Sequence, residues 1–223
     1  MDKIVEISAL SKAYTQGHEQ TLVLEELDFH ISRGEFVSIV GPSGSGKSTF
    51  LNIIGLLDDV YSGEIRLFGR RLEDLDERQK AALRLKNIGF VFQFDSLLPE
   101  FTVLENIEMP ARVAGAGRPA RAMELLKRFG LEAIAAKFPM EISGGEKQRA
   151  AMLRALRNAP ALLIADEPTG NLDRHNSGTV LDDLRRAADG GTAVLMVTHN
   201  EEAARRADRV LRMSAGKLQK AGT

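Results

Sequence analysis

The amino-acid sequence predicts an α/β fold, with a parallel-sheet core, a small antiparallel β lobe and an inserted helical lobe. One observation is the order strand, glycine loop, helix over 36–57, which is the setting of a phosphate-binding loop. Another is a series of short apolar runs that end in polar residues, as buried parallel strands do, at 88–92, 162–165 and 193–197. A third is a group of helix patterns within about 95–155. Because no Pro- or Ser-rich linker interrupts the chain, we expect one domain over 1–223.

The β lobe is expected ahead of the phosphate-binding loop. Residues 3–31 alternate weakly and carry β-branched and aromatic positions, a pattern that predicts an antiparallel strand pair or more. A further short strand between glycine turns is expected at 62–69, and a charged helix at 76–86. Residues 210–213 and 217–219 are expected to close the chain as a short strand and a turn.

The helical lobe is predicted from two apolar stripes and the residues that end them. A helix that begins at Val103 is expected to stop at Pro110, because proline lacks the N–H that a helix interior needs. A second helix runs from Ala120 to Phe129, and Gly130 is expected to cap it. These helices predict a lobe inserted between strands rather than a separate domain.

Composition narrows the possible partners. Acidic and basic residues are interspersed, the net charge is −1, and the sequence has no basic stripe. We therefore expect no nucleic-acid partner. The chain has no cysteine, which excludes disulfides and thiol catalysis. No signal-peptide pattern starts the chain, and no apolar run approaches the ~20 residues that span a bilayer. We therefore expect any membrane association to come through a partner.

The glycine-rich loop fits the phosphate-binding pattern G-x-x-x-x-G-K-[ST]. Its glycines let the backbone approach phosphates closely, and the following helix adds the partial positive charge of its N-terminus. Lys47 can reach the β- and γ-phosphates, and the Ser48 hydroxyl can ligate magnesium. The alternative is a glycine turn that binds nothing. The expected contacts are Gly41, Pro42, Ser43, Gly44, Ser45, Gly46, Lys47, Ser48 and Thr49.

Polar residues at three further strand ends extend this candidate site. Ligands of parallel α/β sheets lie outside the carboxyl ends of the strands, so Gln93 is either a contact or a glutamine in water. Asp166 fits a magnesium-facing acid, and Glu167 fits a group that positions or deprotonates water. His199 can donate to a γ-phosphate or orient water.

Two other stretches leave alternatives open. Ser143 and Glu146 form a capping-box pattern that can simply begin a helix. Gly144 and Gly145 weaken that first turn, however, and glycines there make sense if the helix start admits a phosphate or another backbone. Tyr14 either stacks on a base or is an ordinary half-buried strand tyrosine.

Taken together, these motifs resemble those of the ATP-binding subunit of ABC transporters. They follow one another along the whole chain in this order: 41–49, Gln93, 142–148, 162–168, 171–173 and 198–199. The resemblance implies a P-loop NTPase core of the RecA-like type that binds ATP and Mg²⁺. Ile142 and Glu146 stand where leucine and glutamine are commonest, and neither departure removes a phosphate contact.

The resemblance also implies a role for each matching residue. Beyond the loop 41–49, the implied nucleotide-binding residues are Tyr14, which would stack on adenine, Gln93, Ser143, Gly144, Gly145 and Asp173. The implied metal ligands are Ser48, Gln93 and Asp166. The implied catalytic residues are Lys47, Glu167 and His199. Because 143–145 would grip the γ-phosphate bound to the opposite subunit, two copies are expected to close over two ATP molecules.

Within that family, residues 92–106 are similar to the lipoprotein-releasing (Lol-type) ATPases, close kin of macrolide-efflux and cell-division ATPases. The similarity implies an ATPase that forms a homodimer on ATP and drives integral membrane permease subunits from the cytoplasmic side of the bacterial inner membrane. The alternative within the family is an ATP-gated scaffold of the cell-division type, which signals rather than transports. A GTPase would need an Asn-Lys-x-Asp motif, which is absent, and a kinase would not need 142–146.

Overall fold

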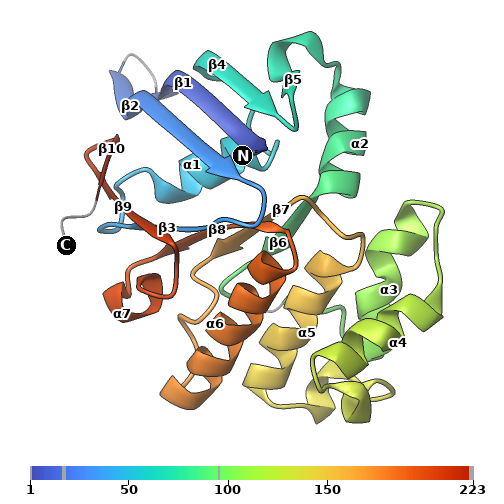
Figure 1. Ribbon diagram of the computed structural model, residues 1–223. Helices are drawn as coiled ribbons and strands as arrows, with labels where there is room; N and C mark the ends of the chain where they lie inside the picture. Colours follow the sequence, from blue (N-terminus) through green and yellow to red (C-terminus); the bar gives the residue numbers. More distant parts are fainter. Residues whose placement is uncertain (1, 17–18, 95, 221–223) are drawn as a thin grey trace.

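The computed structural model describes residues 2–16, 19–94 and 96–220, which form two sheets with helices around them (Figure 1). The first sheet has the order β2-β1-β4-β5 and is antiparallel. Its strands are β1 Lys3–Gln16, β2 Glu19–Ser32, β4 Ser62–Leu67 and β5 Arg70–Arg71. This sheet confirms the antiparallel lobe predicted from the sequence. Asp95, which belongs to the stretch similar to the Lol-type ATPases, lies outside the described residues.

The second sheet has six strands in the order β10-β9-β3-β8-β7-β6. Five of them run parallel: β3 Phe36–Val40, β6 Ile88–Val91, β7 Leu162–Asp166, β8 Ala193–Thr198 and β9 Arg209–Ser214. The last strand, β10 Lys217–Lys220, pairs antiparallel with β9. The chain therefore closes as a hairpin of two strands, and the predicted single strand and turn were wrong, because the turn between them returns the chain along β9.

Seven α-helices and three short 3₁₀ turns complete the described residues. The α-helices are α1 Lys47–Ile54, α2 Glu77–Asn87, α3 Val103–Val113, α4 Pro119–Arg128, α5 Gly144–Leu156, α6 Arg174–Asp189 and α7 Glu201–Ala204. The 3₁₀ turns are Leu72–Asp74, Glu132–Ile134 and Pro139–Glu141. Sequence reasoning missed α6 and α7. The signal for α6 was the N-cap Asp173 followed by Val180 and Leu184, which lie on its buried face.

The expectation that Pro110 ends its helix was wrong, because α3 continues to Val113. Proline in a helix interior costs about 3 kcal/mol through its missing N–H and its ring. Two features offset that cost here. Ile107 and Ala111, on either side of the proline, are fully buried against neighbouring helices. The Pro110 carbonyl also accepts a helical bond from Ala114 N–H at 3.1 Å.

The core has two apolar clusters, one on each face of the parallel sheet. One cluster fills the space between the two sheets and includes α1, where Phe50 meets Phe29 edge-to-face at 5.2 Å between ring centroids. The other cluster lies on the opposite face and includes residues of α3, α4, α5 and α6. Figure 1 shows these helices on the side of the parallel sheet away from the β lobe. Within the described residues, no helix is long and apolar enough to cross a membrane.

Candidate nucleotide site

The parallel sheet gathers the predicted site residues at one edge. The loop 41–49 follows β3, His199 follows β8, Glu167 follows β7 and Gln93 follows β6. These four strands are consecutive neighbours and run in the same direction, so their carboxyl ends meet along one edge. The site predicted from strand ends is therefore a single place in the fold.

Glycines fix the shape of the phosphate-binding loop. Gly44 and Gly46 have φ values of 77° and 105°, a region that side-chain-bearing residues rarely adopt. A Cβ on Gly46 would lie 2.8 Å from Leu24 Cδ2, and one on Gly41 would lie 2.2 Å from the Met213 carbonyl oxygen. Gly46 is also the N-cap of α1 and no side chain caps this helix, so its first N–H groups point into the loop without a side-chain partner.

The loop presents donors that suit phosphate. Lys47 Nζ donates to the carbonyl oxygens of Gly41 and Pro42, each at 2.8 Å, which holds the ammonium across the mouth of the loop. The buried Ser45 hydroxyl has no hydrogen-bond partner among the described residues. An ammonium, a helix N-terminus and an unsatisfied hydroxyl together fit a phosphate chain.

Ser48 and Asp166 form the part of the site that suits a divalent cation. Ser48 Oγ donates to Asp166 Oδ2 at 3.4 Å. Burial, and then the adjacent Glu167 carboxylate, raise the pKa of Asp166 above its usual range. A bound cation relieves both effects, because it favours the ionised carboxylate. In the described part of the chain no three His, Cys, Asp or Glu side chains converge as a metal site.

Glu167 is held by the residues at the end of the neighbouring strand. Its Oε2 accepts a hydrogen bond from Thr198 Oγ1 at 3.0 Å, and its Oε1 accepts one from His199 N–H at 2.8 Å. The His199 Nδ1 atom also lies 2.8 Å from Oε1. The Glu167 backbone has a φ of 48°, a strained value of the kind that recurs at functional sites. Sequence reasoning included Thr198 in the motif 198–199 but gave it no role.

Gln93 and Asp173 have their hydrogen-bond partners in the segment after β7 rather than on the phosphate-binding loop. Gln93 Nε2 donates to Asn171 Oδ1 at 3.2 Å, and Asn171 Nδ2 donates back to the Gln93 carbonyl oxygen at 3.3 Å. Asp173 is the N-cap of α6 and accepts from Asn176 N–H at 2.9 Å. The described hydrogen bonds thus tie the loop after β6 to the turn after β7. Contact of Gln93 with magnesium stays a prediction.

The segment Ser143–Gly145 lies elsewhere in the molecule. Ser143 is the N-cap of α5 in a complete capping box with Glu146, as predicted. A Cβ on Gly145 would lie 2.3 Å from Asn176 Oδ1, whereas one on Gly144 would meet nothing within 4 Å. Figure 1 places the first turn of α5 at the lower end of the view, away from the first turn of α1 at the left. One chain therefore does not bring this segment to its own phosphate-binding loop.

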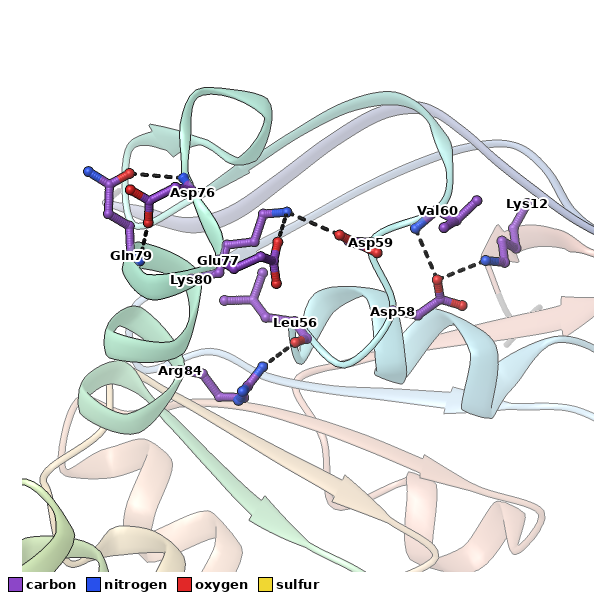
Figure 2. A network of polar contacts seen from close by, with 10 residues as sticks. All are labelled: Lys12, Leu56, Asp58, Asp59, Val60, Asp76, Glu77, Gln79, Lys80 and Arg84. Atoms are coloured by element: carbon purple, nitrogen blue, oxygen red, sulfur yellow. Dashed lines mark hydrogen bonds and ion pairs between the residues drawn. The ribbon is translucent and has the colours of Figure 1, made fainter.

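Tyr14 is on β1 and is 45% exposed, which is more open than an ordinary half-buried strand tyrosine. Its hydroxyl donates to Asp58 Oδ2 at 3.3 Å. Sequence reasoning missed Asp58 and its ion-pair partner Lys12 (Figure 2). The stacking of Tyr14 on a base stays a prediction.

The family model described as ABC transporter matches residues 24–170. The chain belongs to the ABC transporter family. It is 48% identical over 214 residues to the lipoprotein-releasing system ATP-binding protein LolD of Bordetella pertussis, covering 94% of this chain and 93% of that protein. It is 46% identical over 222 residues to LolD of Shewanella oneidensis, covering 98% and 96%.

Solved ABC cassettes match this fold closely. One is a dimeric cassette in a post-hydrolysis state, bound to ADP and phosphate, with a TM-score of 0.85 and 38% identity over 98% of this chain and 100% of that one. Another dimeric bacterial ABC transporter cassette has the same TM-score, identity and coverage. These likenesses confirm the P-loop α/β fold and the resemblance stated from the motifs. This ABC protein is an ATPase that binds nucleotide.

Proposed function

We propose that this ABC ATPase powers lipoprotein release from the inner membrane, as one of two identical subunits on the cytoplasmic face of a membrane complex. Two relatives that carry the name of a lipoprotein-releasing system are 48% and 46% identical to this chain over nearly its whole length. The substrate is inferred from this likeness, and the chemistry below is inferred from the site.

The observation that carries the proposal is the division of phosphate-binding groups between two distant places on one chain. The loop 41–49 and the strand ends form one place, and the start of α5 at Ser143–Gly145 forms the other. Two copies arranged head to tail would complete two sites, each with a loop from one subunit and Ser143–Gly145 from the other. ATP would then stabilise the closed dimer, because it contacts both subunits only in that state. The two solved cassettes are dimeric, which supports the association of two copies.

Hydrolysis is assigned to the residues at the sheet edge. Lys47 binds the β- and γ-phosphates and offsets the charge that develops on the transferred phosphoryl group. Glu167, held by Thr198 and His199, orients and deprotonates the attacking water. Ser48, Gln93 and Asp166 would hold Mg²⁺, which when bound supplies positive charge to the phosphate oxygens. Tyr14 would hold the adenine, and Asp173 would contact the opposite subunit.

The membrane subunit would dock beside Gln93. An apolar groove there is lined by residues of α2, β6, α3 and α5, among them Leu85, Phe90 and Val113. Phe92 and Phe94 flank Gln93 and are 44% and 71% exposed, which is unusual for phenylalanine in a protein that works alone. An apolar helix of the permease would bury these rings, and movement of the loop after β6 would pass to Asn171 and the turn before α6.

Recovery of the tagged chain from native membranes tests the partner, and reconstitution tests the substrate. We expect a polytopic partner to copurify, and the reconstituted complex to release a bound lipoprotein from proteoliposomes only with ATP. A complex carrying Lys47→Ala serves as the matched control and should release none. Copurification of a cell-wall hydrolase complex without lipoprotein release would instead support the signalling scaffold.

A further inference from the structure

Three side chains beyond the phosphate-binding loop form a compact polar group. Lys12 Nζ lies 2.8 Å from Asp58 Oδ1, and the Tyr14 hydroxyl donates to Asp58 Oδ2 at 3.3 Å. The Lys12 ammonium also lies 4.8 Å from the centroid of the Tyr14 ring. Asp58 follows α1, whereas Lys12 and Tyr14 belong to β1, so the group joins the β lobe to the helix of the phosphate-binding loop. Figure 2 shows Lys12 directed at Asp58.

The group lies close to the phosphate-binding loop. Strand β2 pairs with β1 so that Lys12 is opposite Leu24 and Tyr14 is opposite Thr21. Leu24 in turn packs against Gly46, because a Cβ there would lie 2.8 Å from Leu24 Cδ2. Tyr14 is therefore two residues along β1 from Lys12, whose partner Leu24 on β2 contacts the phosphate-binding loop at Gly46. A nucleotide whose phosphates fill the loop would extend its base toward this edge of β1.

Burial of Lys12 makes its ion pair with Asp58 necessary for stability. The Lys12 side chain is 5% exposed, and an ammonium that is buried without a counter-ion is costly. Burial by itself would raise the pKa of Asp58, but hydrogen bonds from Lys12 and from Val60 N–H outweigh it and leave the pKa below its usual range. Asp58 is therefore ionised at neutral pH and holds the ammonium in one place, over one face of the Tyr14 ring. Only the other face of this 45% exposed side chain is left for a base.

We propose that Lys12 and Asp58 are positioning residues that orient the Tyr14 ring for stacking on the nucleotide base, and so favour nucleotides over bare phosphate chains. The proposal rests on the nucleotide site proposed above. Without Asp58 the hydroxyl of Tyr14 loses its acceptor and Lys12 loses its counter-ion, and the ring is no longer held at both its edge and its face. The phosphate contacts of Lys47 and Ser48 do not involve this group, so they should be unaffected.

The ratio of two affinities tests the proposal. Titration calorimetry on the full chain with ADP and with inorganic pyrophosphate compares ligands that share the phosphates and differ in the base. We expect Asp58→Asn to weaken ADP binding about three- to tenfold, the effect of one lost hydrogen bond, and to leave pyrophosphate binding unchanged. In turnover assays the same variant should raise the KM for ATP and leave kcat unchanged. The reason is that Lys12, Tyr14 and Asp58 act on the base equally in the ground state and in the transition state. Tyr14→Phe should reproduce part of the loss.

Asp59→Asn is the matched control. Asp59 is the next residue on the same loop, yet it pairs with Lys80 of α2 at 3.4 Å and is 58% exposed (Figure 2). We expect this variant to bind both ligands as the native chain does. If Asp58→Asn does not fold because Lys12 is left unpaired, the double variant Lys12→Met/Asp58→Asn removes both charges and is measured instead.

Two outcomes would overturn the proposal. Equal weakening of ADP and pyrophosphate by Asp58→Asn would mean that the ion pair only supports the fold around α1. An unchanged ADP affinity would mean that the ring needs no such support. Tyr14→Ala tests base stacking separately from the role of Lys12 and Asp58. If Tyr14→Ala weakens ADP binding and Asp58→Asn does not, Tyr14 stacks on the base without help from Lys12 and Asp58. That result would refute this proposal and leave the nucleotide site standing.

Discussion

Two regions of this molecule begin a helix at a predicted phosphate-binding segment, and they differ in what surrounds them. At α1 the helix has no side-chain cap, and Lys47 and Ser48 of its first turn bond to other parts of the same site. At α5 Ser143 bonds to Glu146 of its own helix in an ordinary capping box. The first region therefore offers its donors to a phosphate within one chain, whereas the second would act in the proposed site only if another molecule brought a phosphate to it.

The largest effect is expected at the sheet edge that carries the first region, at Glu167, the residue that we propose activates water. Glu167→Gln keeps the shape of the side chain but removes the base, so hydrolysis should fall at least about 100-fold while ATP still binds. The ATP-bound dimer should then accumulate, because ATP bridges the subunits and is not consumed. Phosphate release measures the first effect, and light scattering after size-exclusion chromatography measures the second.

Glu202→Gln is the control for this substitution. Glu202 lines the same cavity as Glu167, but its carboxylate pairs with Arg174 at 3.2 Å and is 77% exposed. Turnover in this variant should match the native chain. Native turnover in Glu167→Gln would contradict the assignment of the base.

A smaller and more selective effect is expected from the second region. Ser143→Arg places a long cationic side chain where the γ-phosphate of the opposite subunit would approach. ATP affinity measured without magnesium should stay within about twofold of native, because the loop 41–49 is intact, a difference below about 0.5 kcal/mol. Dimer formation with ATP, followed by light scattering, should be abolished. Unchanged dimerisation would refute a site shared between subunits.

The difference between the two regions also explains what the sequence could predict. Loop, strand ends and caps are patterns of neighbouring residues, and a parallel sheet with right-handed connections brings the strand ends to one edge. The strand-end pattern therefore predicted Gln93, Glu167 and His199 as candidates at one edge of the sheet. Their roles in catalysis stay predictions.

What sequence reasoning missed depends on pairing between distant residues. Lys12 and Asp58 are 46 positions apart, and nothing local to either residue indicates that one neutralises the other. The continuation of α3 through Pro110 was missed because it also depends on distant residues. Burial of Ile107 and Ala111 against other helices outweighs the tendency of proline to end a helix. Helix α6 was overlooked although its N-cap and apolar spacing were present in the sequence.

The smallest effect compares two helices of the described chain, α3 and α5, which both begin with a capping box made by a hydroxyl side chain and a glutamate. At α3, Thr102 N–H and hydroxyl donate to Glu105 at 2.9 and 2.8 Å, and Glu105 N–H donates back at 3.3 Å. At α5, the corresponding distances for Ser143 and Glu146 are 2.8, 2.8 and 3.3 Å. In both glutamates hydrogen bonds from the cap, the backbone N–H first, lower the pKa. The two caps are therefore equivalent as local structure.

Thr102→Ala and Ser143→Ala should each lower the free energy of unfolding by about 1 kcal/mol, the usual cost of a lost N-cap, as urea denaturation would measure. Only Ser143→Ala should also weaken ATP-driven dimerisation and turnover, because only that hydroxyl would face a phosphate of the opposite subunit. If both variants lose stability equally and both keep native turnover, Ser143 is a helix cap and nothing more. The γ-phosphate contact of the second region would then have to come from the backbone of Gly144 and Gly145 alone.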